Sequence, residues 1–175
     1  MTQLIVLDTV FDAPIAEVFA TSLSVNLHLD SMVKHREKVV AGRTTGQSVE
    51  DDVVTWSARH FGLPLRLTIR IFDVDAPHRF ADEQVRGPFA VYHHEHLFEE
   101  IEGRTHMQDR LTIAAPSGHS GASQRGSYCV AICRRCSRSA MLRLSERRGN
   151  AHGRPKRRAP VVTRKKIDHF VYDAR

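Results

Sequence analysis

Two histidines and an aspartate lie on neighbouring stretches of this chain, in a pattern that could support acid–base or metal chemistry. His94 and His96 are two residues apart. Successive side chains of a β-strand alternate between its faces, so both imidazoles are expected on one face. Asp109 lies on the following stretch with a strand pattern. Because imidazole titrates near neutral pH, this trio could act as acid and base in a dehydration or cyclisation.

The same trio has two other interpretations. Two imidazoles and a carboxylate could hold zinc or another divalent ion. Buried His and Asp side chains also hydrogen-bond each other and the backbone inside sheets, and a motif of three such residues has low specificity. We therefore expect hydrogen bonding within the sheet, no metal and no cofactor, and name His94, His96 and Asp109 as candidate catalytic residues only.

All three cysteines of the chain lie in the stretch CVAICRRC, Cys129–Cys136, with the spacing C-x₃-C-x₂-C. Radical S-adenosylmethionine enzymes bind an iron–sulfur cluster with this spacing, but early in a large barrel, whereas only 39 residues follow Cys136 here. Arg135 also stands where those enzymes usually carry an aromatic residue. A zinc site would need a fourth ligand, for which only His119 or His152 is near. Cluster binding is therefore rejected, and the odd cysteine count does not suit a secreted disulfide framework.

Length, composition and charge indicate one globular domain followed by a segment of different character. The chain has 175 residues, 41% hydrophobic and 26% charged, which is typical of globular domains. No apolar run reaches the ~18–20 residues of a membrane-spanning helix. The first residues lack the basic region and cleavage site of a signal peptide, so a cytoplasmic protein is expected. Residues 1–120 carry 11 Lys/Arg and 17 Asp/Glu, whereas residues 121–175 carry 15 and 3.

Hydrophobic periodicity and turn residues predict the elements that would position the trio. Residues 4–11 alternate as a strand, and apolar residues at helical spacing predict short helices over 15–24 and 25–33. Six more strands, separated by Gly, Pro and Asp, are predicted over 37–42, 49–60, 65–75, 80–87, 90–102 and 105–114. Short connections favour antiparallel neighbours. The predicted fold class is α+β, with a sheet that needs a cover on one face.

Six short motifs follow one another through the first two-thirds of the chain. They are Pro14 with the following helix, Trp56–Gly62, Phe80-x-Asp82-Glu83-Gln84, Gly87-Pro88-Phe89, His94-x-His96-x-Phe98-Glu99 and Thr105-x-Met107-x-Asp109. In order and spacing they resemble the START-like, or SRPBCC, superfamily, which includes polyketide cyclase/dehydrase-like proteins, and within it a bacterial branch of small ligand-binding domains. The resemblance implies a helix-grip fold, in which about seven antiparallel strands curl around a long C-terminal helix and enclose an apolar cavity.

A small hydrophobic or amphipathic ligand between sheet and helix is what this resemblance implies. Such sites are mostly apolar, with a few polar groups that orient the ligand. Strand alternation selects the side chains of one face, and among the polar ones Gln84 is expected to point inward with the trio. The predicted ligand-binding residues are Leu67, Ile69, Gln84, Tyr92, His94, His96, Phe98, Met107, Asp109 and Leu111.

The region after Pro116 departs from the family pattern. It is rich in Ser, Arg and Gly and poor in the Leu and Glu of a long helix. Codons chosen for Ser123 onward, read two bases later, encode Ala-Glu-Arg-Val-Leu-Leu-Arg-Arg-Tyr-Leu-Gln-Glu-Val-Leu-Glu-Lys-Arg-Asn, an amphipathic helix. We therefore hypothesise a frameshift near 116–123. The chain divides into a START-like domain over 1–117, a degraded or replaced C-terminal helix region over 118–148 and a basic, disordered tail over 149–175.

The predicted function is binding of a small hydrophobic ligand in the cavity, impaired by the frameshift. The alternative is a cyclase/dehydrase-type enzyme that acts on an aromatic or polyketide-like substrate in the same cavity. The basic tail could bind anions through charge alone. It carries no recognisable motif that reads nucleic acid, so no specific nucleic-acid partner is expected.

Overall fold

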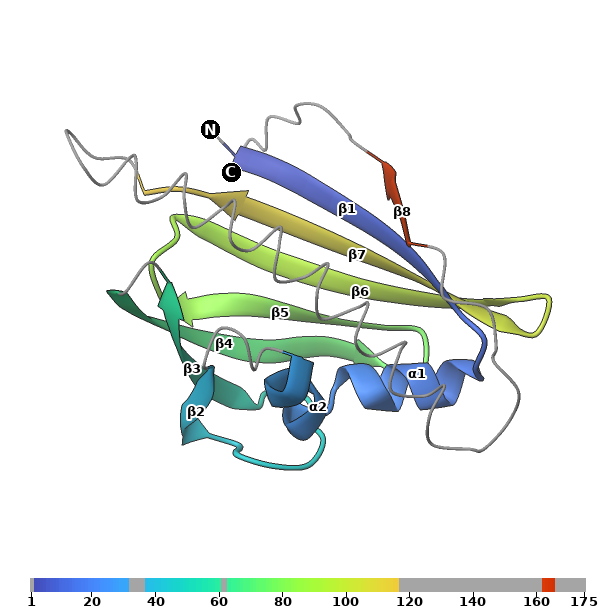
Figure 1. Ribbon diagram of the computed structural model, residues 1–175, viewed down its shortest axis with the longest axis horizontal. Helices are drawn as coiled ribbons and strands as arrows, with labels where there is room; N and C mark the ends of the chain where they lie inside the picture. Colours follow the sequence, from blue (N-terminus) through green and yellow to red (C-terminus); the bar gives the residue numbers. More distant parts are fainter. Residues whose placement is uncertain (1, 32–36, 61–62, 117–161, 166–175) are drawn as a thin grey trace.

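An antiparallel sheet carries most of the described chain, which comprises residues 2–31, 37–60, 63–116 and 162–165 of the computed structural model (Figure 1). Its strands are β1 (Thr2–Phe11), β2 (Lys38–Gly42), β3 (Val53–His60), β4 (Leu63–Asp75), β5 (Arg79–Arg86), β6 (Val91–Ile101), β7 (Arg104–Ala114) and β8 (Val162–Lys165). Their order in the sheet is β2-β3-β4-β5-β6-β7-β1-β8. β2 to β7 thus form the predicted meander, and the α+β class is confirmed.

A two-residue turn sets the register of the β6–β7 hairpin. Glu102 and Gly103 both have positive φ, 53° and 72°, which is the backbone of a type I′ turn. Ile101 therefore pairs with Arg104, and the register continues along both strands until His96 lies opposite Asp109. The turn sequence thus determines which side chains meet in the middle of the sheet.

β1 completes the main sheet by pairing with the last strand of the meander. Ten residue pairs join β1 to β7, from Thr2 opposite Ala114 to Phe11 opposite Thr105. β1 to β7 form the curved sheet of seven strands expected for a helix-grip fold. β6 and β7 are both interior strands of this sheet, so each has a paired neighbour on both sides.

Two short helices follow β1 and lie against one face of the sheet (Figure 1). They are α1 (Ile15–Ser22) and α2 (Val25–Ser31). The carbonyl oxygen of Pro14 accepts hydrogen bonds from the backbone N–H groups of Glu17 and Val18 at the start of α1. Phe19 of α1 makes edge-to-face contacts with Phe80 and Phe98 of the sheet. We call the face that α1 covers the inner face.

Buried apolar residues form two groups. The first apolar cluster comprises Phe11, Val18, Phe19, Leu23, Val25, Val54, Trp56, Ile69, Ile71, Phe80, Phe98 and Met107. The second apolar cluster comprises Phe89, Leu111 and Ile113. α1 and α2 contribute to the first cluster alone, so the two ends of the inner face are built differently.

The sequence prediction for the C-terminal part falls mostly on residues that the structure does not describe. The altered helix region over 118–148, with its three cysteines, lies outside the described residues. Within 149–175, predicted to be disordered, Val162–Lys165 form β8 and pair with β1 from Val6 opposite Lys165 to Thr9 opposite Val162. A Val-Thr pair favours extended backbone, and the edge of β1 offers unpaired backbone groups to such a segment.

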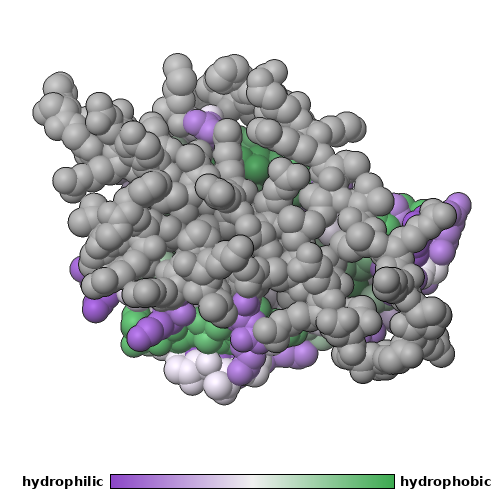
Figure 2. Space-filling model, viewed as in Figure 1, coloured by the Kyte–Doolittle hydropathy of each residue, from purple (hydrophilic) through white to green (hydrophobic). Residues whose placement is uncertain are grey.

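Charged side chains gather at the tip of the β6–β7 hairpin, which projects to the right in Figure 2. Glu99, Glu100, Glu102 and Arg104 are all exposed there. Among the described residues, neither helix is long and apolar enough to cross a membrane. The surface of the hairpin is thus hydrated, whereas its inner side carries the buried groups described next.

Candidate functional site

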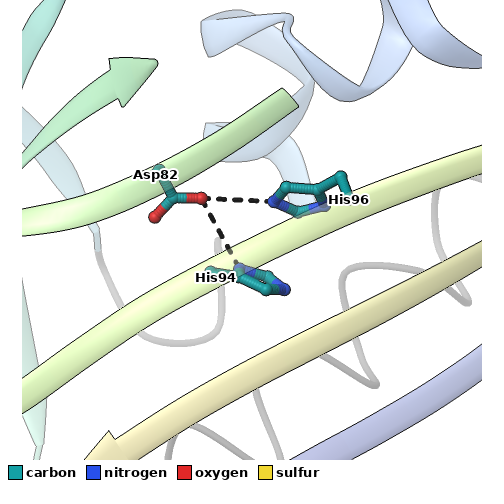
Figure 3. A group of neighbouring side chains, drawn as sticks. All are labelled: Asp82, His94 and His96. Atoms are coloured by element: carbon teal, nitrogen blue, oxygen red, sulfur yellow. Dashed lines mark hydrogen bonds and ion pairs between the residues drawn. The ribbon is translucent and has the colours of Figure 1, made fainter. Parts of the chain in front are cut away.

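β6 places its two histidines side by side on the inner face (Figure 3). His94 and His96 are 8% and 7% exposed, and their ring centroids lie 4.0 Å apart. Tyr92 and Phe98 flank them on the same face, as strand alternation requires. Phe80 of β5 stacks on His96, with 4.2 Å between ring centroids and 19° between ring planes. The imidazoles are therefore held among aromatic rings rather than in solvent.

β7 adds the third candidate, Asp109. This carboxylate is 1% exposed and lies opposite His96 in the register set by the hairpin turn. Its Oδ1 is 2.8 Å from Nδ1 of His96 and 3.4 Å from Nε2 of His94. The structure therefore brings together the three residues that the sequence analysis named as catalytic candidates.

β5 contributes a fourth buried ionisable group, Asp82, which the sequence analysis missed. It is 5% exposed and lies opposite His94. Its Oδ2 is hydrogen-bonded to Nε2 of His96 at 3.2 Å and lies 3.6 Å from Nδ1 of His94 (Figure 3). Strand alternation could have found it, because Asp82 is two residues from both Phe80 and Gln84 and shares their face. We call Asp82, His94, His96 and Asp109 the quartet.

The charges of the quartet support one another. Burial alone would lower the pKa of His96, but its contacts with Asp109 and Asp82 outweigh this and raise the pKa to about 9. Burial would raise the pKa of Asp109, but contacts with His94 and His96 lower it to about 2. Burial would also raise the pKa of Asp82, but contacts with His96 and His94 together hold it below its usual value. At neutral pH a protonated His96 therefore lies between two carboxylates.

Several quartet atoms have no hydrogen-bond partner among the described residues. They are Nε2 of His94, Nδ1 of His96 and both carboxylate oxygens of Asp109. The contacts to Asp109 are short, but their geometry is not that of a hydrogen bond. Oγ1 of Thr9, on the neighbouring strand β1, also lacks a partner and is buried. Buried polar atoms are normally satisfied, so these atoms could accept a partner from outside the described residues.

Apolar side chains border the quartet on both sides along the strands. On β7, Met107 and Leu111 flank Asp109, and they belong to the first and the second apolar cluster. The apolar residues predicted to bind ligand all lie in these clusters or pack against them: Ile69, Phe98 and Met107 in the first, Leu111 in the second, and Leu67 and Tyr92 against both. The quartet is thus a polar patch within an apolar face.

Gln84, the remaining predicted ligand-binding residue, lies on β5 but bonds elsewhere. Its Nε2 donates to the carbonyl oxygen of Phe89 at 2.9 Å, and its Oε1 accepts from the backbone N–H of Phe89 at 3.2 Å. The amide therefore closes the β5–β6 connection. Gly87 leaves room for it, because a Cβ there would lie 2.2 Å from Oε1 of Gln84. Gln84 is used for structure here, whereas Asp82, one pleat earlier, joins the quartet.

Three members of the quartet have atoms placed for a metal ion. Asp82, His94 and His96 each offer one ligand atom, and these atoms lie within 4.8 Å of one another. All three residues are buried. Asp109 lies against the other nitrogens of the two imidazole rings.

Known structures show which fold this arrangement belongs to, although no protein-family model and no curated protein sequence matches the chain. The Zhui aromatase/cyclase from Streptomyces sp. R1128 superposes with a TM-score of 0.70 at 15% identity, over 87% of this chain and 99% of that one. A START superfamily protein from Mycobacterium smegmatis gives 0.60 at 7% identity, over 82% and 98%. A protein from Thermus thermophilus gives 0.65 at 17% identity, over 82% and 95%. The chain therefore has the START-like, or SRPBCC, fold.

Proposed function

We propose that the protein binds a small, largely apolar ligand with one polar group, held against the inner face in a cavity between the sheet and a C-terminal helix. The observation that carries the proposal is the quartet between two apolar clusters. Aromatic and aliphatic side chains such as Tyr92, Phe98 and Leu111 would contact the apolar body of the ligand. The quartet would orient the polar group, in the manner of ligand sites with few polar contacts.

Asp109 is the group that would receive a donor from the ligand. Its two oxygens have no hydrogen-bond partner among the described residues, and its lowered pKa keeps it ionised. A hydroxyl of the ligand could donate to this carboxylate, and a carbonyl oxygen could accept from the protonated His96. Either contact would satisfy buried atoms that the sheet leaves unpaired.

Native mass spectrometry of the full chain with a panel of hydroxylated aromatic compounds tests this proposal. We expect one bound molecule per chain, and at least tenfold weaker binding in Asp109→Asn. His93→Gln is the matched control, because His93 neighbours His94 on β6 but lies on the opposite face. Equal binding by Asp109→Asn and wild type, or an equal loss in His93→Gln, would contradict the proposal.

A cyclase or dehydrase activity is the second candidate, favoured by the pairing of a protonated His96 with the Asp109 carboxylate. In a β-hydroxy ketone, Asp109 would remove the proton α to the carbonyl, and His96 would protonate the departing hydroxyl. The products are an enone and water, and the proton returns from Asp109 to His96 through solvent. An aromatase/cyclase is among the proteins that share the fold. Enone formation monitored by absorbance should disappear in both Asp109→Asn and His96→Gln, and its persistence in either would exclude this mechanism.

We also propose that a frameshift near residues 116–123 altered the C-terminal helix that covers the cavity, and so weakened ligand binding. We further propose that the protein is cytoplasmic and that its basic tail binds anions only through charge. The alternative reading frame, which restores an amphipathic helix, supports the first part. Sequencing the gene tests it. A codon usage after residue 116 that matches the first 115 codons, with no helix in another frame, would refute the frameshift.

A further inference from the structure

We propose that Asp82, His94 and His96 bind one divalent transition-metal ion of the zinc type, with Asp109 orienting both imidazoles from the opposite side. The three ligand atoms are Oδ2 of Asp82, Nδ1 of His94 and Nε2 of His96. The inference concerns a metal-loaded protein in which both imidazoles are neutral, and it is tested without an organic ligand. It also departs from the sequence expectation, in which no metal was predicted and Asp109 was the only carboxylate considered as a ligand.

The distances from the Asp82 carboxylate to the two imidazole nitrogens match those between ligands of a tetrahedral ion. Zinc lies about 2.0–2.1 Å from nitrogen and oxygen ligands, so two ligands of a tetrahedral ion are about 3.3–3.4 Å apart. Oδ2 of Asp82 is 3.2 Å from Nε2 of His96 and 3.6 Å from Nδ1 of His94. These two distances bracket the tetrahedral value, and all three atoms lie within 4.8 Å of one another. Two imidazoles and one carboxylate form a donor set that first-row transition metals use, with further positions left open.

Asp109 supplies a carboxylate that can accept the second N–H of each metal-binding histidine. A ligating imidazole commonly donates its second N–H to a carboxylate, which fixes the tautomer and the ring orientation. Oδ1 of Asp109 lies 3.4 Å from Nε2 of His94 and 2.8 Å from Nδ1 of His96. These are the two nitrogens that would not face the metal, and both lie within ion-pair distance of the carboxylate.

A dication could take the place of the protonated His96 as the charge that compensates the two buried carboxylates. Asp82 and Asp109 place two negative charges at positions that are 5% and 1% exposed. Buried charge is costly unless it is compensated. A single dication bound by neutral imidazoles would neutralise both carboxylates and use the ring nitrogens of His94 and His96 that face Asp82. The described residues hold no Lys or Arg within ion-pair distance of the quartet carboxylates that could do this instead.

Cobalt(II) titration of the full chain, freed of metal by chelation, tests the proposal without any organic ligand. We expect one ion per chain and the intense visible absorption of tetrahedral cobalt, which zinc then displaces. Because Cys129, Cys133 and Cys136 offer thiolates, the titration uses a background with all three changed to Ser. Folding is checked by circular dichroism and by thermal unfolding before each titration. A folded chain that binds no cobalt at micromolar concentration would overturn the proposal.

Five single variants separate the metal ligands from a residue that acts through them and from a residue outside the site. Asp82→Asn, His94→Gln and His96→Gln should each abolish the visible bands. Asp109→Asn should keep the one-to-one stoichiometry but weaken binding about 10–100-fold, as expected for a group that acts through the ligands. His93→Gln, on the outer face of β6, should bind as wild type. Retention of the bands in Asp82→Asn, or their loss in His93→Gln, would refute the assignment.

Discussion

The inner face of the sheet holds two contrasting regions, one of apolar packing and one of buried charge, and neighbouring residues of the same strands contribute to both. On β6, Phe98 packs edge-to-face on Phe19 of α1, with 5.4 Å between ring centroids. One pleat away, His96 lies between two carboxylates, and one of these has no hydrogen-bond partner among the described residues. The first arrangement gains free energy by removing apolar surface from water. The second accepts buried charge and unsatisfied atoms.

This difference separates stability from function along a single strand. Replacing buried ion pairs with apolar residues of similar volume is often neutral or stabilising, so stability alone gives little reason for the quartet. The first apolar cluster, joined by α1 and α2, is where truncation should cost most. Variants in the first apolar cluster and variants in the quartet therefore test whether stability and function can be changed separately.

The largest effect is expected at the apolar end. Phe19→Ala removes a ring that contacts both Phe80 and Phe98, and loss of a buried Phe typically costs about 3–5 kcal/mol in the free energy of unfolding. Urea denaturation measures this. Val85→Ala is the control, because Val85 is 60% exposed and should change stability by less than about 0.5 kcal/mol. A Phe19→Ala cost near the control value would show that α1 does not anchor the sheet.

The pH dependence of the metal-free protein is the next effect in size. The pKa of His96 is about 9 in the folded state, above its ordinary value, so its charge stabilises the fold fully below about pH 6.5 and is lost as the pH rises through 9. The expected loss is about 3 kcal/mol. Asp109, with a pKa of about 2, contributes above about pH 4 and loses its contribution as the pH falls towards 2.

Unfolding in urea at pH 6.5 and 9, with a chelator present, measures the alkaline loss. His96→Gln should remove it. Asp82, Asp109 and His94 face His96 directly, whereas His28 of α2 acts on Asp82 alone among these groups. His28→Gln is therefore the control, and it should keep most of the alkaline loss of stability. Equal stability of the wild type at both values would mean that the quartet is not coupled as described.

A smaller effect is expected where a polar side chain of the same face serves the fold alone. Gln84→Ala removes both hydrogen bonds to the backbone of Phe89, at about 1–2 kcal/mol. Cobalt affinity should be unchanged, because both hydrogen bonds of the amide go to the backbone of Phe89. Thermal unfolding and cobalt titration on the same samples provide both values. A change in cobalt affinity larger than that of His93→Gln would show that Gln84 also supports the metal site.

The smallest effect is expected for an ion pair on exposed residues of the same strands. Arg70 of β4 lies 2.6 Å from Glu83 of β5, and both side chains are well exposed. Such pairs contribute about 0–1 kcal/mol. A double-mutant cycle with Arg70→Ala and Glu83→Ala should give a coupling energy below about 1 kcal/mol. A larger value would mean that burial is not what distinguishes the quartet.

The sequence predicted the sheet well because its signals are local. Alternating residues and turn pairs such as Glu102–Gly103 define each strand within a few residues of its observed ends. The alternation of side chains along a strand also placed His94, His96 and Asp109 on one face. Asp82 was missed because strand alternation tells which face a side chain occupies but not how far it lies from a side chain of the next strand. Which inward residue of β5 meets the histidines depends on the register between β5 and β6. Gln84 was selected instead because its bond to Phe89 depends on the path of the connection, which no residue pattern specifies.

Gly87 restricts which substitutions are possible at the β5–β6 connection. An alanine there would place its methyl group on the amide of Gln84 and 2.8 Å from Cδ1 of Leu67, displacing the amide from the backbone of Phe89. Positions 84 and 87 are therefore expected to be exchanged jointly in natural homologues: a side chain at 87 would accompany a shorter residue at 84 and a rebuilt connection. Aligned homologues that vary at one of the two positions while the other stays fixed would show that the coupling is loose.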